Sequence, residues 1–301
     1  MYRVLTNDGL QQGAIDKLEK LGFEVVNTHY NQDVLGKELK EFDAIVIRSA
    51  TKLTKEILDE ASEGKLKLAI RAGVGIDNID VIHAKGIGID VRNTPNASSD
   101  SVAELALAHI FAVARFLCDS NCTMRNGQWN KKKYQGTEIS GKTLGIIGMG
   151  RIGQSLANKA KALGMNVIYY TIEGKHDDLE YECVSFKDVL KKSDFLSLHV
   201  PYDKEKGTLI DDKEFELMKD GVYLINCARG KVVSEEALIK ALDSGKVCGA
   251  GIDVFEQEPT ANETLINHPR VSVTPHIGAS TREAQDRIGE EVVDIIKDFF
   301  A

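Results

Sequence analysis

Short apolar segments alternate along the chain with longer segments in which apolar residues recur every three or four positions. The short segments predict buried strands, and the longer ones predict amphipathic helices. In the first third we expect five strands, at residues 2–6, 23–27, 44–47, 66–70 and 87–91. We expect helices between them, at residues 12–21, 31–40, 54–61 and 78–85. This alternation predicts an α/β fold in which helices cover both faces of a parallel sheet.

A polar break at residues 93–99 ends this first series. The next segment predicts one long helix from Ser99 to about Met124, capped by Ser98 or Ser99. That helix is apolar around most of its circumference, so it must be buried on several sides, within the chain or against a second copy. Residues 125–141 are polar, contain the single tryptophan, Trp129, and predict a loop or arm. Together the helix and the arm favour a homodimer.

A second series of strands and helices fills the rest of the chain. Its strands are expected at residues 144–147, 166–170, 195–199, 223–226, 249–254 and 271–274. Residues 281–300 predict an amphipathic helix that packs back on the first series. We therefore expect two doubly wound parallel-sheet domains with a cleft between them. Residues 1–95 and 281–301 would form one domain, and residues 96–280 would form the other.

The most specific motif follows the first strand of the second series. The apolar run 144–147 leads into Gly148, Gly150 and Gly153, spaced G-x-G-x-x-G, and then into a helix, which is the context of a dinucleotide-binding turn. Gly148 would form the tight turn, Gly150 would let a pyrophosphate approach the backbone, and Gly153 would let the helix pack on the strand. The helix N-terminus would present N–H groups to the phosphates. A glycine-rich turn without a ligand is the alternative.

Polar residues that follow the other strands are the next candidates, because ligands of open α/β sheets bind beyond the carboxyl ends of strands. They are Arg229, Asp253, Glu258, His276 and the segment His199-Val200-Pro201. A surface arginine, a solvated acidic loop and a structural histidine are the simpler explanations. An arginine, a carboxylate and a histidine together fit hydride transfer between a nicotinamide and a 2-hydroxy acid. The histidine would take the alcohol proton, the carboxylate would favour its imidazolium, and the arginine would hold the substrate carboxylate.

Composition narrows the function further. The net charge of −8 gives no support for a nucleic-acid partner. The longest apolar stretch, residues 102–118, contains Glu104, His109 and Arg115, so we expect no membrane span. Five cysteines without framework spacing predict reduced, mostly buried thiols and no metal site. The N-terminus lacks an apolar signal core, so we expect a cytoplasmic protein.

Taken together, the motifs resemble those of the D-isomer-specific 2-hydroxyacid dehydrogenase family over nearly the whole chain. The resembling segments are residues 46–51, 71–80, 101–105, 148–153, 225–230, 253–259 and 274–278. The resemblance implies a Rossmann dinucleotide-binding domain and a discontinuous flavodoxin-like substrate domain. It also implies a catalytic triad in which His276 is the general acid/base, Glu258 its partner and Arg229 the substrate anchor.

The same resemblance implies NAD as the cofactor. Asp253 and the carbonyl of Cys227 would orient the nicotinamide carboxamide, Arg151-Ile152 would lie on the pyrophosphate, and Val200-Pro201 would lie along the adenosine. The implied cofactor-binding residues are Val74, Gly148, Gly150, Arg151, Ile152, Gly153, Thr171, His199, Val200, Pro201, Cys227, Ala228, Asp253, His276 and Gly278.

For the substrate, the resemblance implies a small 2-hydroxy or 2-oxo acid. Arg229 and His276 would contact it, and the backbone N–H groups of Val74 and Gly75 would bind its carboxylate. Three arginines would bind a substrate phosphate, namely Arg48, Arg71 and Arg125, the last from a neighbouring subunit. The expected reaction is NAD-dependent oxidation of 3-phospho-D-glycerate in serine biosynthesis. Two alternatives are an enzyme acting on glyoxylate, hydroxypyruvate or another unphosphorylated D-2-hydroxy acid, and a non-catalytic scaffold that senses NAD.

The chain departs from the family pattern at two places. Thr171 stands at the end of the second strand of the nucleotide series, where an acid usually bonds the ribose of NAD. No arginine follows to attract a 2′-phosphate, and Glu173 is near, so we expect NAD and leave NADP or dual use open. The chain also ends after the amphipathic helix, so we expect no feedback by serine through a regulatory domain.

Overall fold

The computed structural model describes residues 1–301 and divides into two compact units. One unit comprises residues 1–98 and 279–301, and the other comprises residues 99–278. These limits lie within a few residues of the domain boundaries that the sequence predicts. Each unit is described by itself below.

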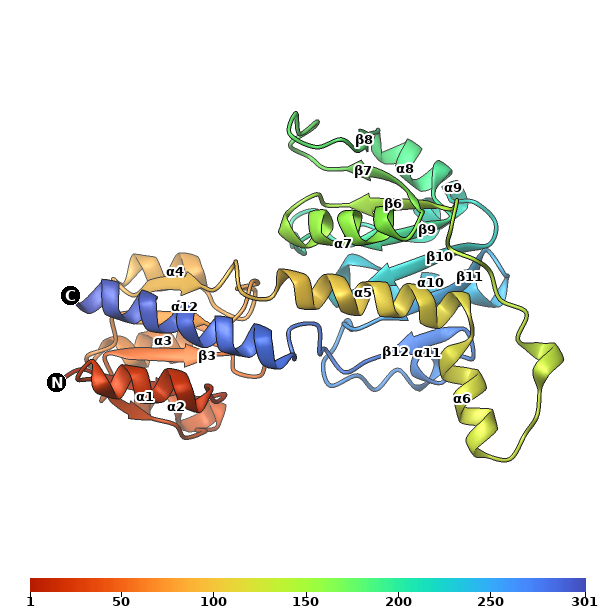
Figure 1. Ribbon diagram of the computed structural model, residues 1–301. Coiled ribbons are helices and arrows are strands. Elements are labelled where there is room, and N and C mark those ends of the chain that lie inside the picture. Colours follow the sequence, from red (N-terminus) through yellow and green to blue (C-terminus); the bar gives the residue numbers. More distant parts are fainter. The chain divides into compact units, whose positions relative to one another are not determined.

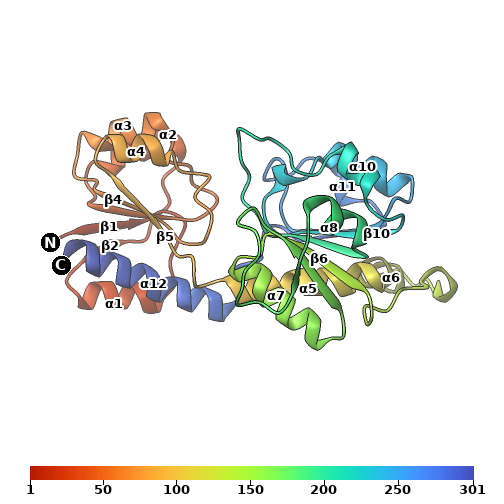
Figure 2. The same ribbon diagram turned by 90° about the horizontal axis from the view of Figure 1, so that it is seen from above.

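The first unit is a five-stranded parallel sheet with the order β2-β1-β3-β4-β5. Its strands are β1 (Arg3–Thr6), β2 (Glu24–Val26), β3 (Ala44–Ile47), β4 (Leu68–Arg71) and β5 (Asp90–Asn93). Its helices are α1 (Gln12–Lys20), α2 (Gln32–Leu39), α3 (Lys55–Ser62), α4 (Val81–Gly86) and α12 (Arg282–Phe300). Figure 2 shows α2, α3 and α4 on one face of this sheet and α1 and α12 on the other.

The C-terminal helix α12 completes the first unit, as its apolar stripe predicts. Ile288, Val292 and Ile296 of α12 are buried in one cluster with Ala14 and other residues of α1 and the sheet. Backbones approach closely there, because a Cβ atom at Gly289 would lie 2.9 Å from the Cβ of Ala14. The segment 279–301, separated from residues 1–98 by the whole second unit, thus supplies part of one layer of the N-terminal unit.

The second unit is a seven-stranded parallel sheet with the order β12-β11-β10-β9-β6-β7-β8. Its strands are β6 (Thr143–Ile147), β7 (Asn166–Tyr170), β8 (Glu182–Cys183), β9 (Phe195–Leu198), β10 (Val222–Asn226), β11 (Val247–Ile252) and β12 (Val271–Val273). Its helices are α5 (Ser99–Ala114), α6 (Leu117–Arg125), α7 (Arg151–Ala162), α8 (Phe186–Lys192), α9 (Asp212–Leu217), α10 (Glu235–Asp243) and α11 (Glu263–Ile266). Short 3₁₀ turns lie at Lys131–Lys133 and Gly230–Val232. Helices α5 and α7 cover one face of the sheet, and α8 and α10 cover the other (Figure 2).

The prediction of one long helix from Ser99 to Met124 is wrong. Helix α5 ends at Ala114, and α6 continues at an angle of 65° after Phe116, whose φ of 54° is left-handed. The carbonyl of Ala114 accepts a hydrogen bond from the backbone of Thr137, so the returning arm takes the place of the next helical turn. Figure 1 shows α6 turning away from α5 and the arm coming back.

Smaller differences concern element limits and cysteines. The strand expected at residues 87–91 lies at Asp90–Asn93, because Asp80 caps α4 and shifts that helix toward the C-terminus. The two-residue strand β8 has no apolar run that could reveal it.

Cys118, Cys122 and Cys248 are exposed, so the expectation of mostly buried thiols is wrong for three of the five. No single helix is long and apolar enough to cross a membrane, although the bent pair of α5 and α6 passes that test by length and composition.

Candidate active site

Three of the candidate residues follow three strands that are neighbours in the second unit. Arg229 follows β10, Glu258 follows β11, and His276 follows β12, and these strands pair in parallel in that order. The carboxyl ends of parallel strands meet at one edge of a sheet, so the three loops share one edge. The structure therefore brings the predicted triad to one place.

His276 and Glu258 are in direct contact. The Nδ1 atom of His276 lies 2.6 Å from Oε2 of Glu258, and both side chains remain about one-third exposed, 30% and 35%. His276 is also one of two residues other than glycine with a left-handed backbone, at φ 53°. Such backbone strain is typical of functional sites, where the surrounding contacts hold it in place. A partly exposed imidazole oriented by a carboxylate can exchange protons with a ligand.

The surroundings of Glu258 favour its ionised form. Burial raises the pKa of its carboxyl group, but the hydrogen bond and charge of His276, the N–H of Phe255 and the charge of Arg229 lower it by more. The net effect is a pKa below the usual value, so Glu258 is a carboxylate near neutral pH. Arg229 is therefore part of the same electrostatic cluster as the His276–Glu258 pair.

The turn that carries Arg229 is held by its neighbours. The amide of Asn226 accepts from the backbone of Ala228 and donates to the carbonyl of Arg229, and Nη1 of Arg229 donates to the carbonyl of Ala228 at 2.6 Å. A Cβ atom at Gly230 would lie 1.8 Å from the carbonyl oxygen of Phe255, so only glycine fits there. This close approach sets the Arg229 turn against the loop that leads to Glu258.

Asp253 is a deeply buried carboxylate among the predicted site residues, with 1% of its surface exposed. Its Oδ1 accepts from the hydroxyl of Thr274 at 2.6 Å and the N–H of Ile277 at 2.8 Å, and its Oδ2 accepts from the N–H of Gly278 at 2.9 Å. Asp253 thus fixes the turn that follows His276. A carboxylate has about four acceptor positions, so one remains on Oδ2 for a ligand amide, and its role toward a nicotinamide stays a prediction.

Cys227 and Ala228 lie in the same region as Asp253. Burial, and then the charge of Asp253, raise the pKa of the Cys227 thiol, so the thiol stays protonated. Gly278 is buried, and a Cβ atom on it would lie 3.2 Å from Oδ2 of Asp253. Two predicted cofactor residues, Cys227 after β10 and Gly278 after β12, therefore lie near the Asp253 carboxylate.

The glycine motif has the geometry that a dinucleotide requires. Gly148 has φ 97°, and a Cβ atom on it would lie 2.4 Å from the carbonyl of His199. A Cβ atom at Gly153 would lie 2.3 Å from the carbonyl of Gly148, whereas one at Gly150 would meet nothing within 4 Å. The outer two glycines thus allow close packing, and the middle one faces open space. Helix α7 begins at Arg151 without a side-chain cap, so its first N–H groups can hold a pyrophosphate there.

The end of β9 lies against this motif. Burial lowers the pKa of His199 to about 4, so its ring is neutral, and Nε2 lies 2.9 Å from the hydroxyl of Ser197. Its Nδ1 is buried without a hydrogen-bond partner. Val200 is half-buried and Pro201 is exposed, as expected for residues that would border an adenosine. These residues and the glycine motif fit a bound NAD.

Thr171 and Glu173 lie at the end of β7. The hydroxyl of Thr171 donates a short hydrogen bond to the carboxylate of Glu173. That bond is the largest of the effects that lower the pKa of Glu173, which is fully exposed. Thr171 thus holds a carboxylate at the end of β7, two residues after the position where the sequence analysis expects an acid.

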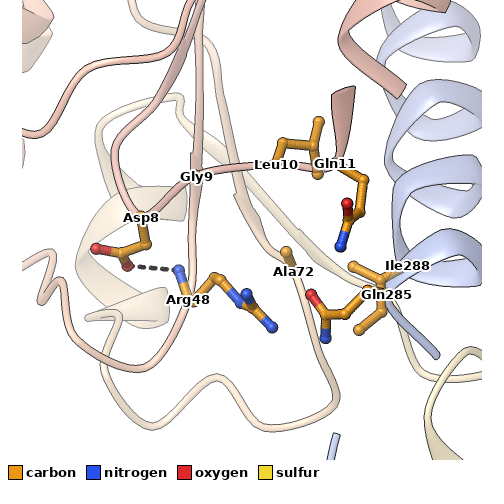
Figure 3. Close-up of a pocket in the computed structure, with 8 residues that line it drawn as sticks. All are labelled: Asp8, Gly9, Leu10, Gln11, Arg48, Ala72, Gln285 and Ile288. Atoms are coloured by element: carbon orange, nitrogen blue, oxygen red, sulfur yellow. Dashed lines mark hydrogen bonds between the residues drawn. The ribbon is translucent and has the colours of Figure 1, made fainter. Parts of the chain in front are cut away.

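In the first unit, Arg48 lines a pocket of about 230 Å³ together with Asp8, Gln11 and Gln285 (Figure 3). Asp8 accepts from the backbone N–H of Arg48 at 2.6 Å and from Thr51 at two atoms. Burial lowers the pKa of the Arg48 guanidinium and the charge of Asp8 opposes this, and an arginine in a protein stays protonated. The pocket therefore combines one cation, one anion and two amides.

The other predicted substrate residues are distributed between the units. Arg71 ends β4, beside β3, and does not line the Arg48 pocket. A Cβ atom at Gly73 would collide with the Arg71 guanidinium, and of the next two residues Val74 is exposed and Gly75 is half-buried. Arg125 belongs to the second unit, at the exposed end of α6, where its Nε donates to Asn121.

Sequence reasoning did not assign a role to His109 or Thr274. His109 is buried in α5, and its two ring nitrogens contact Ser272 and Thr274 of the β12 segment. The available signal is a single histidine in a mostly apolar helix, which by itself argues only against a membrane span. The partners of that histidine lie more than 160 positions away and carry no motif of their own.

Comparisons with known proteins show which proteins this chain is similar to. Residues 107–278 match the profile described as "D-isomer specific 2-hydroxyacid dehydrogenase, NAD binding domain". The chain is 46% identical over 299 residues to the hydroxypyruvate reductase of Thermotoga maritima, covering 98% of this chain and 97% of that protein. It is 42% identical over 301 residues to the D-3-phosphoglycerate dehydrogenase of Methanocaldococcus jannaschii, covering 99% of this chain and 57% of that protein. The solved D-lactate dehydrogenase of Aquifex aeolicus, in complex with NAD and lactic acid, gives a TM-score of 0.84 at 36% identity and covers 99% of this chain and 95% of that one.

Proposed function

Because the chain belongs to the D-isomer specific 2-hydroxyacid dehydrogenase family, we propose that it oxidises 3-phospho-D-glycerate to 3-phosphooxypyruvate with NAD. The observation that carries the chemistry is the contact of 2.6 Å between His276 and Glu258, beside Arg229 at the ends of adjacent strands. NAD, when bound, supplies the acceptor for the hydride that leaves C2.

His276 acts as the general base in oxidation and as the general acid in reduction. The Glu258 carboxylate can only accept hydrogen bonds, so His276 carries a hydrogen on Nδ1. In the neutral ring, Nε2 then has a lone pair, which takes the proton of the C2 hydroxyl during oxidation. In the reverse direction the imidazolium returns that proton to the C2 oxygen of the oxo acid. Glu258 stabilises the imidazolium and fixes the ring orientation.

Arg229 binds the substrate carboxylate, for which a planar guanidinium offers two parallel hydrogen bonds. Its turn is held by Asn226 and by the contact between Gly230 and Phe255, so the guanidinium is held before the substrate arrives. Fixing the carboxylate places C2 within reach of both His276 and the nicotinamide, which lowers the entropic cost of reaction.

The phosphorylated substrate is supported by two arginines at neighbouring strand ends of the first unit. Arg48 and Arg71 follow β3 and β4, and Arg48 lines a pocket with room for a small anion. A guanidinium matches the geometry of a phosphate better than an ammonium group does. Arg125 remains a candidate contributed by a neighbouring subunit.

Reduction of hydroxypyruvate is the second candidate. The similarity to a hydroxypyruvate reductase extends over nearly all of both chains, whereas the chain spans only 57% of the phosphoglycerate dehydrogenase. Asp8 also places a negative charge in the Arg48 pocket, which weakens its attraction for a dianionic phosphate.

The experiment compares kcat/KM for 3-phospho-D-glycerate and D-glycerate in wild type, Arg48→Gln and Arg92→Gln. Arg92 is a partly exposed arginine paired with Asp90 and serves as the control. We expect wild type to prefer the phosphorylated acid, and Arg48→Gln to lose roughly tenfold or more on that substrate alone, the size of one charged hydrogen bond. Equal turnover of the two acids by wild type would refute the phosphate assignment and leave the second candidate.

A further inference from the structure

One buried polar group outside the proposed triad is His109. It lies in the middle of α5, is 2% exposed and is surrounded by apolar neighbours along the helix. Burial, opposed in part by the charge of Asp253, lowers the pKa of His109, so the ring is neutral at physiological pH. A buried polar group costs free energy unless its hydrogen bonds are satisfied. The buried ring of His109 therefore requires a hydrogen-bond partner for each of its two nitrogens.

Helix α5 lies close enough to the sheet for this ring because β11 contains small residues. A Cβ atom at Gly251 would lie 2.5 Å from the Cβ of His109, and one at Gly249 would lie 3.2 Å from the Cβ of Val113. His109 and Val113 are one helical turn apart, so both face the same strand. Because Gly251 has no side chain, it leaves the space that His109 occupies.

Each ring nitrogen of His109 contacts a hydroxyl group of the β12 segment. Nδ1 lies 2.9 Å from Oγ of Ser272, and Nε2 lies 3.0 Å from Oγ1 of Thr274. Residues two apart in an extended segment point to the same side, which explains how one ring meets both hydroxyls. At the far end, Sγ of Cys118 lies 3.4 Å from Oγ of Ser272.

The directions of these bonds follow from the carboxylate at the other end. Thr274 donates its hydroxyl hydrogen to Oδ1 of Asp253, so its oxygen must accept from His109. His109 therefore carries its hydrogen on Nε2, and its Nδ1 accepts from Ser272. Hydrogen bonds donated in one direction thus run from Ser272 through His109 and Thr274 to Asp253.

Asp253, at the end of this series of hydrogen bonds, also binds the turn that contains His276. Its two oxygens accept from the backbone N–H groups of Ile277 and Gly278, directly after His276. The backbone of His276 is left-handed and also donates to the carbonyl of Thr274. Thr274 and Asp253 therefore hold the strained turn from both of its sides.

We propose that His109 is a positioning residue for the reaction, which orients the Thr274 hydroxyl toward Asp253 and so fixes the turn that presents His276 to Glu258. This inference rests on the proposed hydride transfer. His109 does not touch the reacting atoms, and its contribution is to the geometry of His276.

The test uses His109→Leu, which removes both hydrogen bonds, and His109→Gln, whose amide can donate to Thr274 and accept from Ser272. We expect His109→Leu to lower kcat roughly tenfold, the effect of losing the hydrogen bond to Thr274, with little change in the KM for the acid. His109→Gln should recover most of kcat. Val113→Ala removes packing from the same helix face without touching the hydrogen bonds, and should leave kcat unchanged.

A second readout does not depend on activity. Exchange of the Ile277 and Gly278 amide hydrogens reports directly whether Asp253 still holds the turn. We expect faster exchange in His109→Leu and wild-type exchange in His109→Gln and Val113→Ala. If wild type oxidises none of the acids, the proposed function fails, but the exchange experiment still tests the positioning.

Thr274→Val is the second route to the same test, should His109→Leu fold poorly. It replaces the hydroxyl by a methyl group of similar size and should reproduce the loss of kcat. Because His109 acts through Thr274, the double variant should lose no more than either single variant. Additive losses in the double variant, or normal kcat and exchange in His109→Leu, would overturn the proposal.

Discussion

His276 has two properties that seldom occur together: a left-handed backbone in a residue other than glycine, and a carboxylate at hydrogen-bond distance from its ring. The first is stabilised by Asp253, which binds the next two backbone N–H groups. The second gives the ring its orientation and its Nδ1 hydrogen. At the scale of single residues, the site is thus a histidine whose backbone and ring are each held by a different carboxylate.

We expect single residues to determine the choice of cofactor as well. Glu173, held by Thr171, can accept from the ribose hydroxyls of NAD and repel the 2′-phosphate of NADP. We predict that Glu173→Gln lowers the ratio of kcat/KM for NAD to that for NADP by roughly tenfold or more, since a hydrogen bond to a charged group is lost. Asp177→Asn, which alters a nearby exposed acid that lies 3.6 Å from Lys175, is the control. An unchanged ratio in Glu173→Gln would show that Glu173 does not determine the preference for NAD over NADP.

His199 predicts a dependence of stability on pH. Burial lowers its pKa from 6.5 to about 4. Below pH 6.5 the unfolded chain binds a proton that the folded chain excludes, so the free energy of unfolding falls as the pH drops toward 4. The total loss from this residue is about 3 kcal/mol. Urea unfolding of wild type and His199→Gln at several pH values should show a smaller loss in the variant, whereas parallel losses would contradict the assignment.

The candidate residues of the site could be predicted from the sequence, but their arrangement could not. Gly148, Gly150, Gly153, Glu258 and His276 could be predicted because each follows a strand within a recognisable motif. The left-handed φ of His276 and the hydrogen bonds of Asp253 could not, because they depend on which loop lies beside which. His109 was missed for the same reason, since its partners are distant in sequence.

At the scale of elements, the site depends on three adjacent strands and on the close approach of the loops that follow them. The loop after β10 touches the loop after β11 at Gly230 and Phe255. This contact links the position of Arg229 to that of Glu258, although it is formed by Gly230 and Phe255 and not by Arg229 or Glu258.

Gly230→Ala tests this contact. Its Cβ would lie 1.8 Å from the carbonyl oxygen of Phe255, so one of the two loops must move. We predict that kcat/KM falls about a hundredfold, because a displacement near 1 Å in an active site has an effect of that order. Gly13→Ala in α1, where a Cβ would meet nothing within 4 Å, is the control and should keep full activity. Unchanged kcat/KM in Gly230→Ala would contradict the prediction, because it would show that the two loops can move without affecting the site.

Most elements could be predicted from the sequence, because buried parallel strands such as β3 and β6 are short apolar runs between helices of clear periodicity. The bend between α5 and α6 could not be predicted. Neither Gly nor Pro marks it, and its cause is the returning arm, which bonds to Ala114 through Thr137. The limits of α4 shifted because of a single cap, Asp80.

At the scale of the whole molecule, the chain crosses between its two units twice, and α12 completes the unit in which the chain begins. The apolar stripe of α12 made this return predictable. Helix α6, by contrast, buries none of its residues within its own unit, and Leu117, Met124 and Trp129 are exposed there, the tryptophan by 78%. Exposed apolar residues gathered on one segment are typical of an interface.

We therefore predict that the protein is a dimer through α6 and the arm that follows it. Sedimentation velocity of wild type should give the mass of two chains, and Met124→Ser combined with Trp129→Ser should shift the population toward monomer. Leu163→Ser, which changes an exposed apolar residue at the end of α7, should have no such effect. A wild type that sediments as a monomer at all concentrations would refute the prediction.

The proposed function requires that His276 transfers the proton while C2 of a D-2-hydroxy acid gives its hydride to NAD. The most direct measurement is NADH formation from 3-phospho-D-glycerate, D-glycerate and L-glycerate by wild type and His276→Asn, together with NADH binding to both. Asparagine tolerates the left-handed backbone but has no basic nitrogen. We expect turnover of a D-acid and not of L-glycerate, and a loss of about 10²–10⁴ in kcat in the variant with unchanged NADH binding. Wild-type turnover by His276→Asn, or no turnover of either D-acid by wild type, would contradict it.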